Sequence, residues 1–198
     1  MLPIDLLTRT AAEVSVAVTP ELAEKLEVYA RLLVEWNEKI NLTAITDPVG
    51  IAVKHFADSL SAAPLLPQGA FSLVDVGTGA GFPGVPLALL REDCALTLLD
   101  SLQKRLTFLD ALCRELGLKA TLVHARAEEG GQNPALREHF DIVTARAVAA
   151  LPASATAKPR FGDANNDGSV NMKDILVLRS HLAGTAVELN AVYADADA

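Results

Sequence analysis

The longest regular pattern of apolar residues lies near the start of the chain and predicts an amphipathic helix. Thr19-Pro20-Glu21 is typical of a helix start, because threonine caps free N–H groups, proline fits the first helical position and an acid favours the first turn. Apolar side chains then recur at spacings of three and four residues, at Leu22, Leu26, Tyr29, Leu33, Trp36 and Ile40. This spacing puts them on one face, so we expect a long helix packed on a core.

A second helix is expected after a break in this pattern. The segments 41–43 and 47–48 interrupt the periodicity, and the proline at position 48 suits the start of a new helix that carries His55, Asp58 and Ser59. His55 and Asp58 allow two interpretations, a catalytic pair or a capping or packing role. We favour the second, because their spacing alone does not establish a contact.

From Phe71 onward the pattern changes to short apolar runs that alternate with helical segments. Helices are expected at residues 85–90 and 104–116, and Gly117 ends the second of them. The apolar runs predict four strands, at residues 71–76, 95–100, 120–124 and 140–145. Apolar strands that alternate with helices are typical of a parallel sheet covered on both faces, so the sequence predicts an α/β fold.

Composition narrows the class of protein. Apolar residues make up 51% of the 198 positions, which is enough for a packed core. No apolar run approaches the ~20 residues of a membrane helix, and the first residues do not have a signal peptide's pattern. Cys94 and Cys113 form no paired motif, so we expect a reduced, cytoplasmic chain with no membrane partner. The net charge of −8 argues mildly against nucleic acid, although RNA binding depends on local basic patches.

A glycine-rich turn follows the first predicted strand, with the sequence DVGTGAGFPG at Asp75–Gly84. Glycines let the backbone approach a ligand and adopt positive φ, and open α/β sheets bind ligands at the carboxyl ends of their strands. A Gly-x-Gly-x-x-Gly pattern from Gly79, with Asp100 as a ribose-binding acid, fits an NAD-dependent oxidoreductase. Alternating glycines after Asp75 fit instead a nucleoside without a pyrophosphate, whose turn the acid orients. An ordinary tight turn is the third alternative.

Five further segments decide between these interpretations. They are Asn41–Ile45, His55–Leu60, Leu98–Arg105, Arg126–Glu129 and Thr144–Ala147. Together with the turn, and in this order and spacing, they closely resemble the ribosomal RNA small-subunit methyltransferase G family from about residue 20 to Leu151. That family consists of Rossmann-like class I methyltransferases with N-terminal helices, which use S-adenosylmethionine to methylate guanine N7 in the 530 loop of 16S rRNA. The resemblance therefore implies this cofactor, this reaction and the small ribosomal subunit as partner.

The resemblance also implies which residues contact the cofactor. They are Gly77, Phe82, Asp100, Ala127, Glu128 and Arg146, with Asp100 included on grounds general to the class. A backbone amide and a carboxylate at 127–128 would read the adenine edge, and Arg146 would lie where the substrate enters. Without the resemblance, Glu128 beside Glu129 is most simply a solvated pair, and Arg146 a surface charge.

The implied reaction needs little acid–base chemistry. Guanine N7 carries an available lone pair, and the methyl donor is a cationic sulfonium. In-line displacement then depends mainly on positioning and electrostatics. For this reason the sequence predicts no general base and no catalytic residue.

The resemblance ends before the family's fold is complete. Segments that follow the fourth strand in the family, among them one that contains a lysine, have no match here. The fourth strand would then present unpaired backbone groups at an open edge. We expect weak stability and little or no methyl transfer unless a partner completes the sheet. Micromolar binding of S-adenosylmethionine by the isolated chain would contradict this expectation.

A second module is predicted beyond domain 1–151. Residues 152–160 are small residues and prolines without periodicity, typical of a linker. In residues 161–198, oxygen-bearing side chains have the spacing of an EF-hand-type calcium loop, and the predicted Ca²⁺ ligands are Asp163, Asn165, Asp167, Ser169 through its carbonyl, and Asp174. Asp174 stands where glutamate is usual and has a shorter reach. A polar turn without metal is the alternative.

This second module resembles part of a dockerin, a calcium-dependent module that binds cohesin domains. A helix follows the loop and ends at Gly184, and residues 194–198 look like the start of a second loop. The resemblance implies a cohesin partner and a secreted protein, whereas the first module implies the cytoplasm, which we favour. A gene fusion and an assembly error between Leu151 and Arg160 both remain open.

Overall fold

The structure is a computed structural model that describes residues 1–146, and residues 147–198 lie outside the described part. The described residues form one unit, Met1–Arg146. Its N-terminal part is helical and consists of α1 (Ile4–Glu13), α2 (Pro20–Ile40), α3 (Pro48–Gly50), the π-helix η1 (Ile51–Ala57), α4 (Asp58–Leu60) and the 3₁₀ turn η2 (Ala63–Leu65). Strands then alternate with helices, in the order β1 (Phe71–Val76), α5 (Gly84–Leu90), β2 (Cys94–Asp100), α6 (Gln103–Glu115), β3 (Ala120–His124), α7 (Ala127–Gln132) and β4 (Ile142–Ala145).

The four strands form one parallel sheet, as the sequence predicts. Their order is β3-β2-β1-β4, so β1 and β2 are central. Leu73 of β1 pairs with Leu96 of β2 on one side and with Ile142 of β4 on the other. The α/β fold and its four parallel strands are thus confirmed. Two strand starts differ: β2 begins one residue earlier and β4 two residues later than predicted.

Helix α2 begins as its sequence pattern predicts. The side chain of Thr19 accepts a hydrogen bond from the backbone N–H of Leu22 at 3.2 Å and caps the helix. The first four apolar residues of the stripe, Leu22, Leu26, Tyr29 and Leu33, are buried. Trp36 and Ile40, in the last turns, are partly buried against the same core. The helix therefore packs through one face.

The second predicted helix is continuous but irregular. It begins at Pro48, where the Asp47 side chain accepts a hydrogen bond from the N–H of Gly50 at 2.7 Å. Its middle, η1, is a π-helix of seven residues that includes His55. The wider turn was not predicted, because it depends on packing rather than on local periodicity. Single π turns inside helices are frequent at functional sites.

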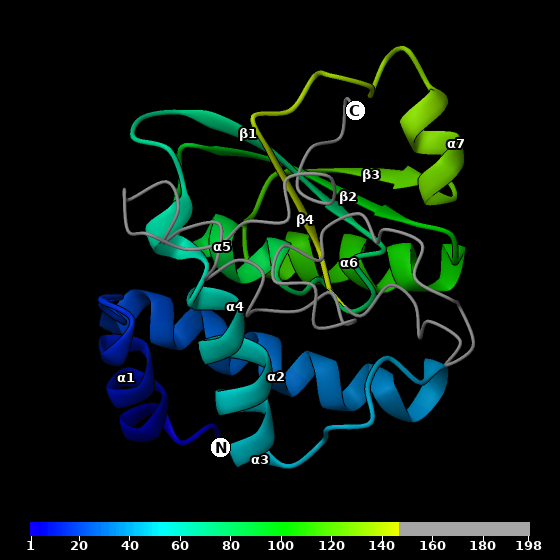
Figure 1. Ribbon diagram of the computed structural model, residues 1–198. Coiled ribbons are helices and arrows are strands. Elements are labelled where there is room, and N and C mark those ends of the chain that lie inside the picture. Colours follow the sequence, from blue (N-terminus) through cyan, green and yellow to red (C-terminus); the bar gives the residue numbers. More distant parts are fainter. Residues whose placement is uncertain (147–198) are drawn as a thin grey trace, which may run out of the picture. The chain divides into compact units, whose positions relative to one another are not determined.

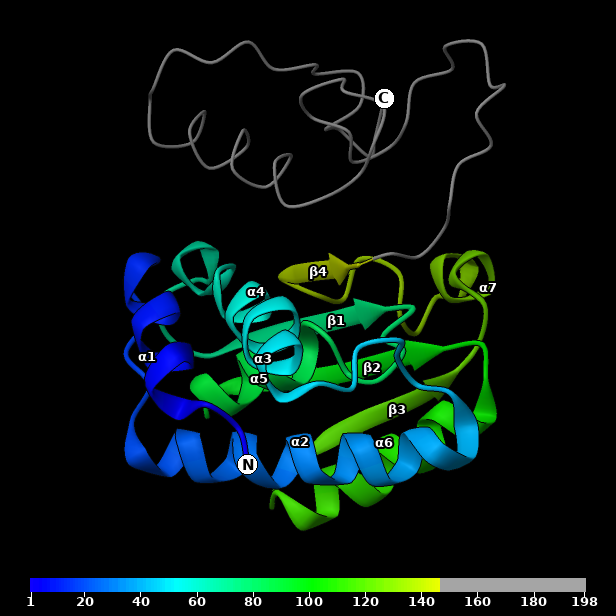
Figure 2. The same ribbon diagram turned by 90° about the horizontal axis from the view of Figure 1, so that it is seen from below.

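The helices lie in layers against the sheet. Figure 1 shows α5 and α6 next to one face of the strands, with α2 beyond them, and α2 contacts both α5 and α6. In Figure 2 the four arrowheads point the same way, with α7 on the side of the arrowheads and α1 on the side of the strand starts. The core comprises apolar side chains of the strands, α5, α6 and the N-terminal helices.

Two helices were not predicted. Helix α1 buries only Leu7 and Ala11, and so short an apolar pattern is not distinctive. Helix α7 contains two glycines among its six residues, a composition with low helix propensity. Gly130 explains the position of α7: a Cβ atom there would lie 2.6 Å from Cδ1 of Leu99 in β2. Close packing on the sheet therefore decides where this helix lies.

Several predictions fall outside the described residues. The linker at 152–160 and the calcium ligands Asp163, Asn165, Asp167, Ser169 and Asp174 all belong to this part of the chain. Within residues 1–146, no helix has the length and apolar character needed to cross a membrane. The same residues contain no cluster of three metal-binding side chains.

Candidate functional site at the carboxyl edge

The residues predicted to contact a cofactor meet at one edge of the sheet. Because all four strands are parallel, their carboxyl ends point to the same side (Figure 2). Gly77 follows β1, Asp100 ends β2, and Arg146 follows β4. Ala127 and Glu128, after β3, begin α7. Open parallel sheets bind ligands at this edge, which we call the carboxyl edge.

The carboxylate of Asp75 fixes the glycine-rich turn through hydrogen bonds. One carboxylate oxygen accepts hydrogen bonds from the hydroxyl of Thr78 at 2.6 Å and the N–H of Gly84 at 3.1 Å. The other accepts one from the hydroxyl of Thr144 in β4 at 2.8 Å. Complete burial raises the pKa of Asp75, and these hydrogen bonds oppose the rise. The acid therefore orients the turn, as its position in the sequence predicts.

Two glycines of the turn serve different purposes. Gly81 has φ +99°, and a Cβ there would lie 2.6 Å from the hydroxyl oxygen of Tyr29, so this glycine allows close packing on α2. Gly79 has φ +61°, and the nearest atom to its Cβ position is the carbonyl oxygen of Gly77 at 3.9 Å. A ligand can therefore approach the backbone at Gly79, whereas Gly81 is enclosed by protein.

Asp100 points toward the turn. One of its carboxylate oxygens accepts a hydrogen bond from the N–H of Gly79 at 2.9 Å, and a guanidinium nitrogen of Arg105 lies 3.3 Å from the same atom. Its other oxygen accepts from the N–H of Leu102 at 2.8 Å. A carboxylate has about four acceptor positions, and protein donors occupy three of them. The side chain of Asp100 is 1% exposed, so it ties β2 to the turn and presents almost no surface to a ligand in this structure.

The side chain of Phe82 is not exposed for a direct contact with a cofactor. It is buried, only 4% exposed, and stacks against Tyr29 with ring centroids 5.0 Å apart and against His55 at 4.5 Å. The hydroxyl of Tyr29 donates a hydrogen bond to the carbonyl of Ala80. Any cofactor contact of Phe82 is therefore through its backbone. Tyr29 supports the turn, a role that its place in an apolar stripe did not reveal.

Arg146 is not a simple surface charge. Its guanidinium forms an ion pair with Asp58 at 2.7 Å and donates a hydrogen bond to the carbonyl of Lys54 at 3.1 Å. A second guanidinium nitrogen lies 3.3 Å from Nδ1 of His55. His55 and Asp58 thus act on a common partner from the end of β4. Their spacing of three residues was the available indication, but the partner lies 88 residues beyond Asp58 in the sequence.

The environment of His55 keeps its imidazole neutral. Burial first and the positive charge of Arg146 second lower the pKa of His55 to about 4, although Asp58 opposes them. The Nε2 atom lies 2.8 Å from the hydroxyl of Thr43. A neutral, hydrogen-bonded histidine agrees with the packing role that we favoured from the sequence.

Ala127 and Glu128 are exposed in the first turn of α7. The neighbouring Glu129 is engaged, because its carboxylate accepts a hydrogen bond from the N–H of Arg126 at 3.0 Å and caps the helix. The two acids are therefore not an equivalent solvated pair. Both acids are exposed, but only the carboxylate of Glu129 caps the helix, and Ala127 has no bulky side chain to cover its backbone.

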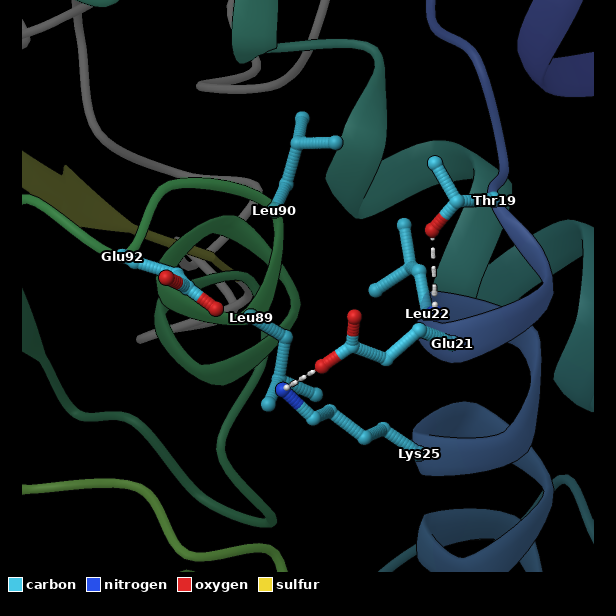
Figure 3. Close-up of a pocket in the computed structure, with 7 residues that line it drawn as sticks. All are labelled: Thr19, Glu21, Leu22, Lys25, Leu89, Leu90 and Glu92. Carbon is cyan, nitrogen blue, oxygen red and sulfur yellow. Dashed lines mark hydrogen bonds and ion pairs between the residues drawn. The ribbon is translucent and has the colours of Figure 1, made fainter.

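A separate pocket of about 170 Å³ lies elsewhere (Figure 3). It is formed between the start of α2 and the end of α5, and it contains none of the predicted site residues. Lys25 and Glu21 form an ion pair at 3.2 Å on its wall. The end of α5 leads into the start of β2, so this pocket belongs to the opposite, amino edge of the sheet.

A parallel sheet whose first strand leads into an acid-anchored glycine turn, with a second acid tied to that turn, defines a Rossmann-like enzyme class that binds nucleosides. The methyltransferases are one branch of this class. A family profile described as rRNA small subunit methyltransferase G matches residues 22–167. The chain belongs to this family. The match extends past Leu151 across the predicted linker and into the start of the predicted calcium loop.

Individual relatives agree with the profile. The chain is 50% identical over 147 residues to ribosomal RNA small subunit methyltransferase G of Clostridium botulinum. The aligned region covers 73% of this chain and 62% of the relative. The protein of the same name from Desulfitobacterium hafniense is 51% identical over 144 residues, 72% of this chain and 59% of the relative. The chain thus spans about three fifths of the length of the curated relatives it matches.

Proposed function

We propose that this chain is an rRNA methyltransferase that binds S-adenosylmethionine at the carboxyl edge. The observation that carries the proposal is the open backbone at Gly79, joined by a 2.9 Å hydrogen bond to the acid that ends β2. Family membership supports the same function, because the matched relatives are named as ribosomal RNA methyltransferases.

The residues at this edge fit a nucleoside cofactor. A ligand can approach the backbone at Gly79, where an added side chain would stand in the way. The carboxylate of Asp100 lies next to this backbone but is buried, so a sugar hydroxyl would reach it by displacing a donor such as Arg105, which lies 3.3 Å away. Ala127 and Glu128 offer an exposed amide and carboxylate for a base edge, and Arg146 provides a fixed positive charge at the end of β4. Bound there, the cofactor supplies an electrophilic methyl group, and the protein contributes its orientation.

Guanine N7 of 16S rRNA, in the 530 loop, is the proposed acceptor. This atom has a lone pair without losing a proton, so the site needs no general base. The buried titratable groups at the carboxyl edge among residues 1–146 are already engaged: Asp75 and Asp100 accept hydrogen bonds from the turn, and His55 contacts Arg146. The proposed partner is the small ribosomal subunit, and the proposed compartment is the cytoplasm, where that subunit is found.

Binding of S-adenosylhomocysteine tests the cofactor site, with a matched pair of glycines as control. Gly79 and Gly117 have φ of +61° and +63°, and an added Cβ has no atom within 3.4 Å at either position. Gly79→Ala and Gly117→Ala should therefore lose similar stability, about 1 kcal/mol for the left-handed backbone. Only Gly79→Ala should also lose affinity in a calorimetric titration. Equal affinities for the two variants would contradict the site.

Methyl transfer tests the reaction itself. Transfer of radiolabel from S-adenosylmethionine to small ribosomal subunits isolated from cells that lack the methyltransferase would support the reaction. Chemical cleavage of the RNA at N7-methylguanine, followed by primer extension, would place the methyl group in the 530 loop. Weak affinity, above a micromolar dissociation constant, and little turnover by this chain stay predictions: the calorimetric titration measures the first, and the radiolabel assay measures the second. Stabilisation by NAD instead of S-adenosylhomocysteine in a melting assay would favour the oxidoreductase alternative.

The calcium site and the cohesin partner stay predictions from the sequence. A titration of the full chain with Ca²⁺, compared between the native sequence and Asp163→Ala, measures the first. Calcium-dependent retention on an immobilised cohesin measures the second. Neither result bears on the carboxyl edge, because every residue of that site belongs to the part from Met1 to Arg146.

A further inference from the structure

We propose that His55 is a positioning residue, which with Thr43 and Asp58 fixes the guanidinium of Arg146 at the carboxyl edge. The proposal rests on the proposed function for its consequence, namely binding of the cofactor beside Arg146. Its geometry stands on the described residues alone. Three acceptors from one helical segment surround the guanidinium: the carbonyl of Lys54, Nδ1 of His55 and the carboxylate of Asp58.

The hydrogen bonds of His55 define its tautomer. Arginine has donors and no acceptor, so the Nδ1 atom that faces Arg146 at 3.3 Å must carry a lone pair. The proton of the neutral ring is then on Nε2, which donates to the hydroxyl oxygen of Thr43 at 2.8 Å. That oxygen also accepts a hydrogen bond from the N–H of Ile45 at 3.0 Å, which fixes its position. A proton on Nδ1 would face the donors of Arg146.

Packing joins this hydrogen-bond network to the glycine-rich turn. The rings of His55 and Phe82 stack with centroids 4.5 Å apart and an interplanar angle of 10°. The guanidinium carbon of Arg146 lies over the ring of Phe82 at 5.1 Å. Phe82 belongs to the turn, His55 to η1, and Arg146 follows β4, so a shift of His55 changes the contacts of three elements.

The charged groups around His55 maintain its neutral form. Arg146 approaches from the end of β4, and Asp58 lies on the same helical segment as His55. The pKa of His55 is lowered by burial first and by Arg146 second, while Asp58 and a hydrogen bond with the Lys54 backbone oppose them. An imidazolium would have to donate from both ring nitrogens, and Arg146 offers no acceptor. The contact between Nδ1 and Arg146 therefore exists only for the neutral ring.

A packing role and a positioning role predict different spectra. Nitrogen NMR of the wild-type full chain should show His55 as the Nε2–H tautomer, unchanged between pH 8 and pH 5. Arg146→Met removes the facing donors and the positive charge, so the pKa of His55 should shift upward. A histidine that only fills space would have no fixed tautomer, whereas its pKa would also rise on loss of the Arg146 charge, so the tautomer is what separates the two roles. Finding the Nδ1–H tautomer in the wild type, or no upward shift in Arg146→Met, overturns the proposal.

The affinity for the cofactor tests whether fixing Arg146 matters for binding. Two variants distinguish the effect of the His55 ring from the effect of its Nδ1 acceptor. His55→Phe keeps a ring against Phe82 and removes both nitrogens, whereas His55→Asn places a carbonyl acceptor near the Nδ1 position. His55→Phe should weaken binding of S-adenosylhomocysteine about tenfold, and His55→Asn by less than about threefold. His139→Phe, an exposed histidine near the start of β4, should leave the affinity unchanged. Urea unfolding of each variant shows that the fold is kept.

A double-mutant cycle completes the test. In the Arg146→Met background, His55→Phe should cause no further loss, because its effect acts through the guanidinium. Additive losses overturn the proposal, since they mean that His55 contributes without Arg146. A wild-type chain that binds no S-adenosylhomocysteine contradicts the proposed function instead. In that case the tautomer and its response to Arg146→Met still decide the positioning role, as they do if His55→Phe fails to fold.

Discussion

The two edges of the sheet use the same residue types in opposite ways. At the carboxyl edge, Asp75 and Asp100 are buried, at most 1% exposed, and accept hydrogen bonds from the backbone and side chains of the glycine turn. At the amino edge, Asp93 and Asp141 are exposed, although each also accepts close hydrogen bonds, from Arg91 and Ser72 respectively. Both edges therefore have hydrogen-bonded acids, and only one of them has buried acids.

The pKa values show what this difference does. Burial raises the pKa of Asp75 in spite of three hydrogen bonds. Hydrogen bonds from Arg91 lower the pKa of Asp93, and those from Ser72 lower that of Asp141, because water still solvates these carboxylates. For Asp75, removal from water outweighs its three hydrogen bonds. Burying the Asp75 carboxylate costs free energy, and in return this acid positions the backbone at which we propose the cofactor binds.

The largest expected effect comes from removing the buried acid at the carboxyl edge. Asp75→Ala leaves two buried donors and the partly buried Thr144 hydroxyl without this acceptor, and it should lower the free energy of unfolding by about 3 kcal/mol or more. Asp75→Asn should cost less, about 1 kcal/mol, since its amide oxygen can still accept and the Thr144 hydroxyl can reverse its role. Urea unfolding measures both. Equal costs for the two variants would show that hydrogen bonding at Asp75 is not what matters.

The next effect is a dependence of stability on pH. The pKa of His55 is about 4 in the folded chain, against an ordinary value of 6.5. Between these values the unfolded chain binds a proton that the folded chain does not, so stability is full above pH 6.5 and falls as the pH is lowered toward 4. The loss is at most about 3 kcal/mol. Urea unfolding at pH 7, 5.5 and 4.5 measures it, and His55→Phe should show a shallower decline.

A smaller effect concerns the helix that presents Ala127. Gly130→Ala places a methyl group 2.6 Å from Leu99, whose side chain can move, so we expect a loss of about 1 to 2 kcal/mol. Gly131→Ala is the matched control, because its Cβ position is open, and it should be neutral or stabilising by up to about 1 kcal/mol. Thermal melting compares the two. A larger loss for Gly131→Ala would mean that α7 does not pack on β2 as described.

The smallest expected effect belongs to the amino edge. Asp93→Asn weakens an exposed, two-contact pair with Arg91, with distances of 2.8 and 2.9 Å. Water and salt replace most of such an interaction, so the urea midpoint should not change measurably. A clear shift of that midpoint would remove the distinction between the two edges. The comparison with Asp75→Asn keeps the substitution the same and changes only its location.

Much of the fold was predictable because it depends on local repeats. The three- and four-residue spacing of α2 and the apolar runs of the four strands are properties of the adjacent residues themselves. Helix α7 was missed because its two glycines are unfavourable for a helix, and the contact with Leu99 that explains Gly130 lies outside the segment. The π-helical turn at His55 was missed for the same reason.

For the site, the sequence identified which segments take part but not how they act. It indicated the glycine turn and the acid at Asp75, because alternating glycines after a strand have few other uses. It assigned Phe82 as a contact without showing that its ring is buried between other side chains. It left Arg146 between a surface charge and a site residue, since the residues that bind it lie about 90 positions away, in η1 and α4.

The sequence by itself determined the parallel sheet, its glycine turn and the family to which the chain belongs, because each depends on a short, ordered pattern of residues. Only the tertiary structure decided that His55 and Asp58 converge on Arg146, that Thr43 holds His55, and that Asp100 is bonded to Gly79. The physical reason is that hydrogen bonds and burial depend on distances in space. Those distances are set when β4 pairs beside β1 and the N-terminal helices pack on the same core.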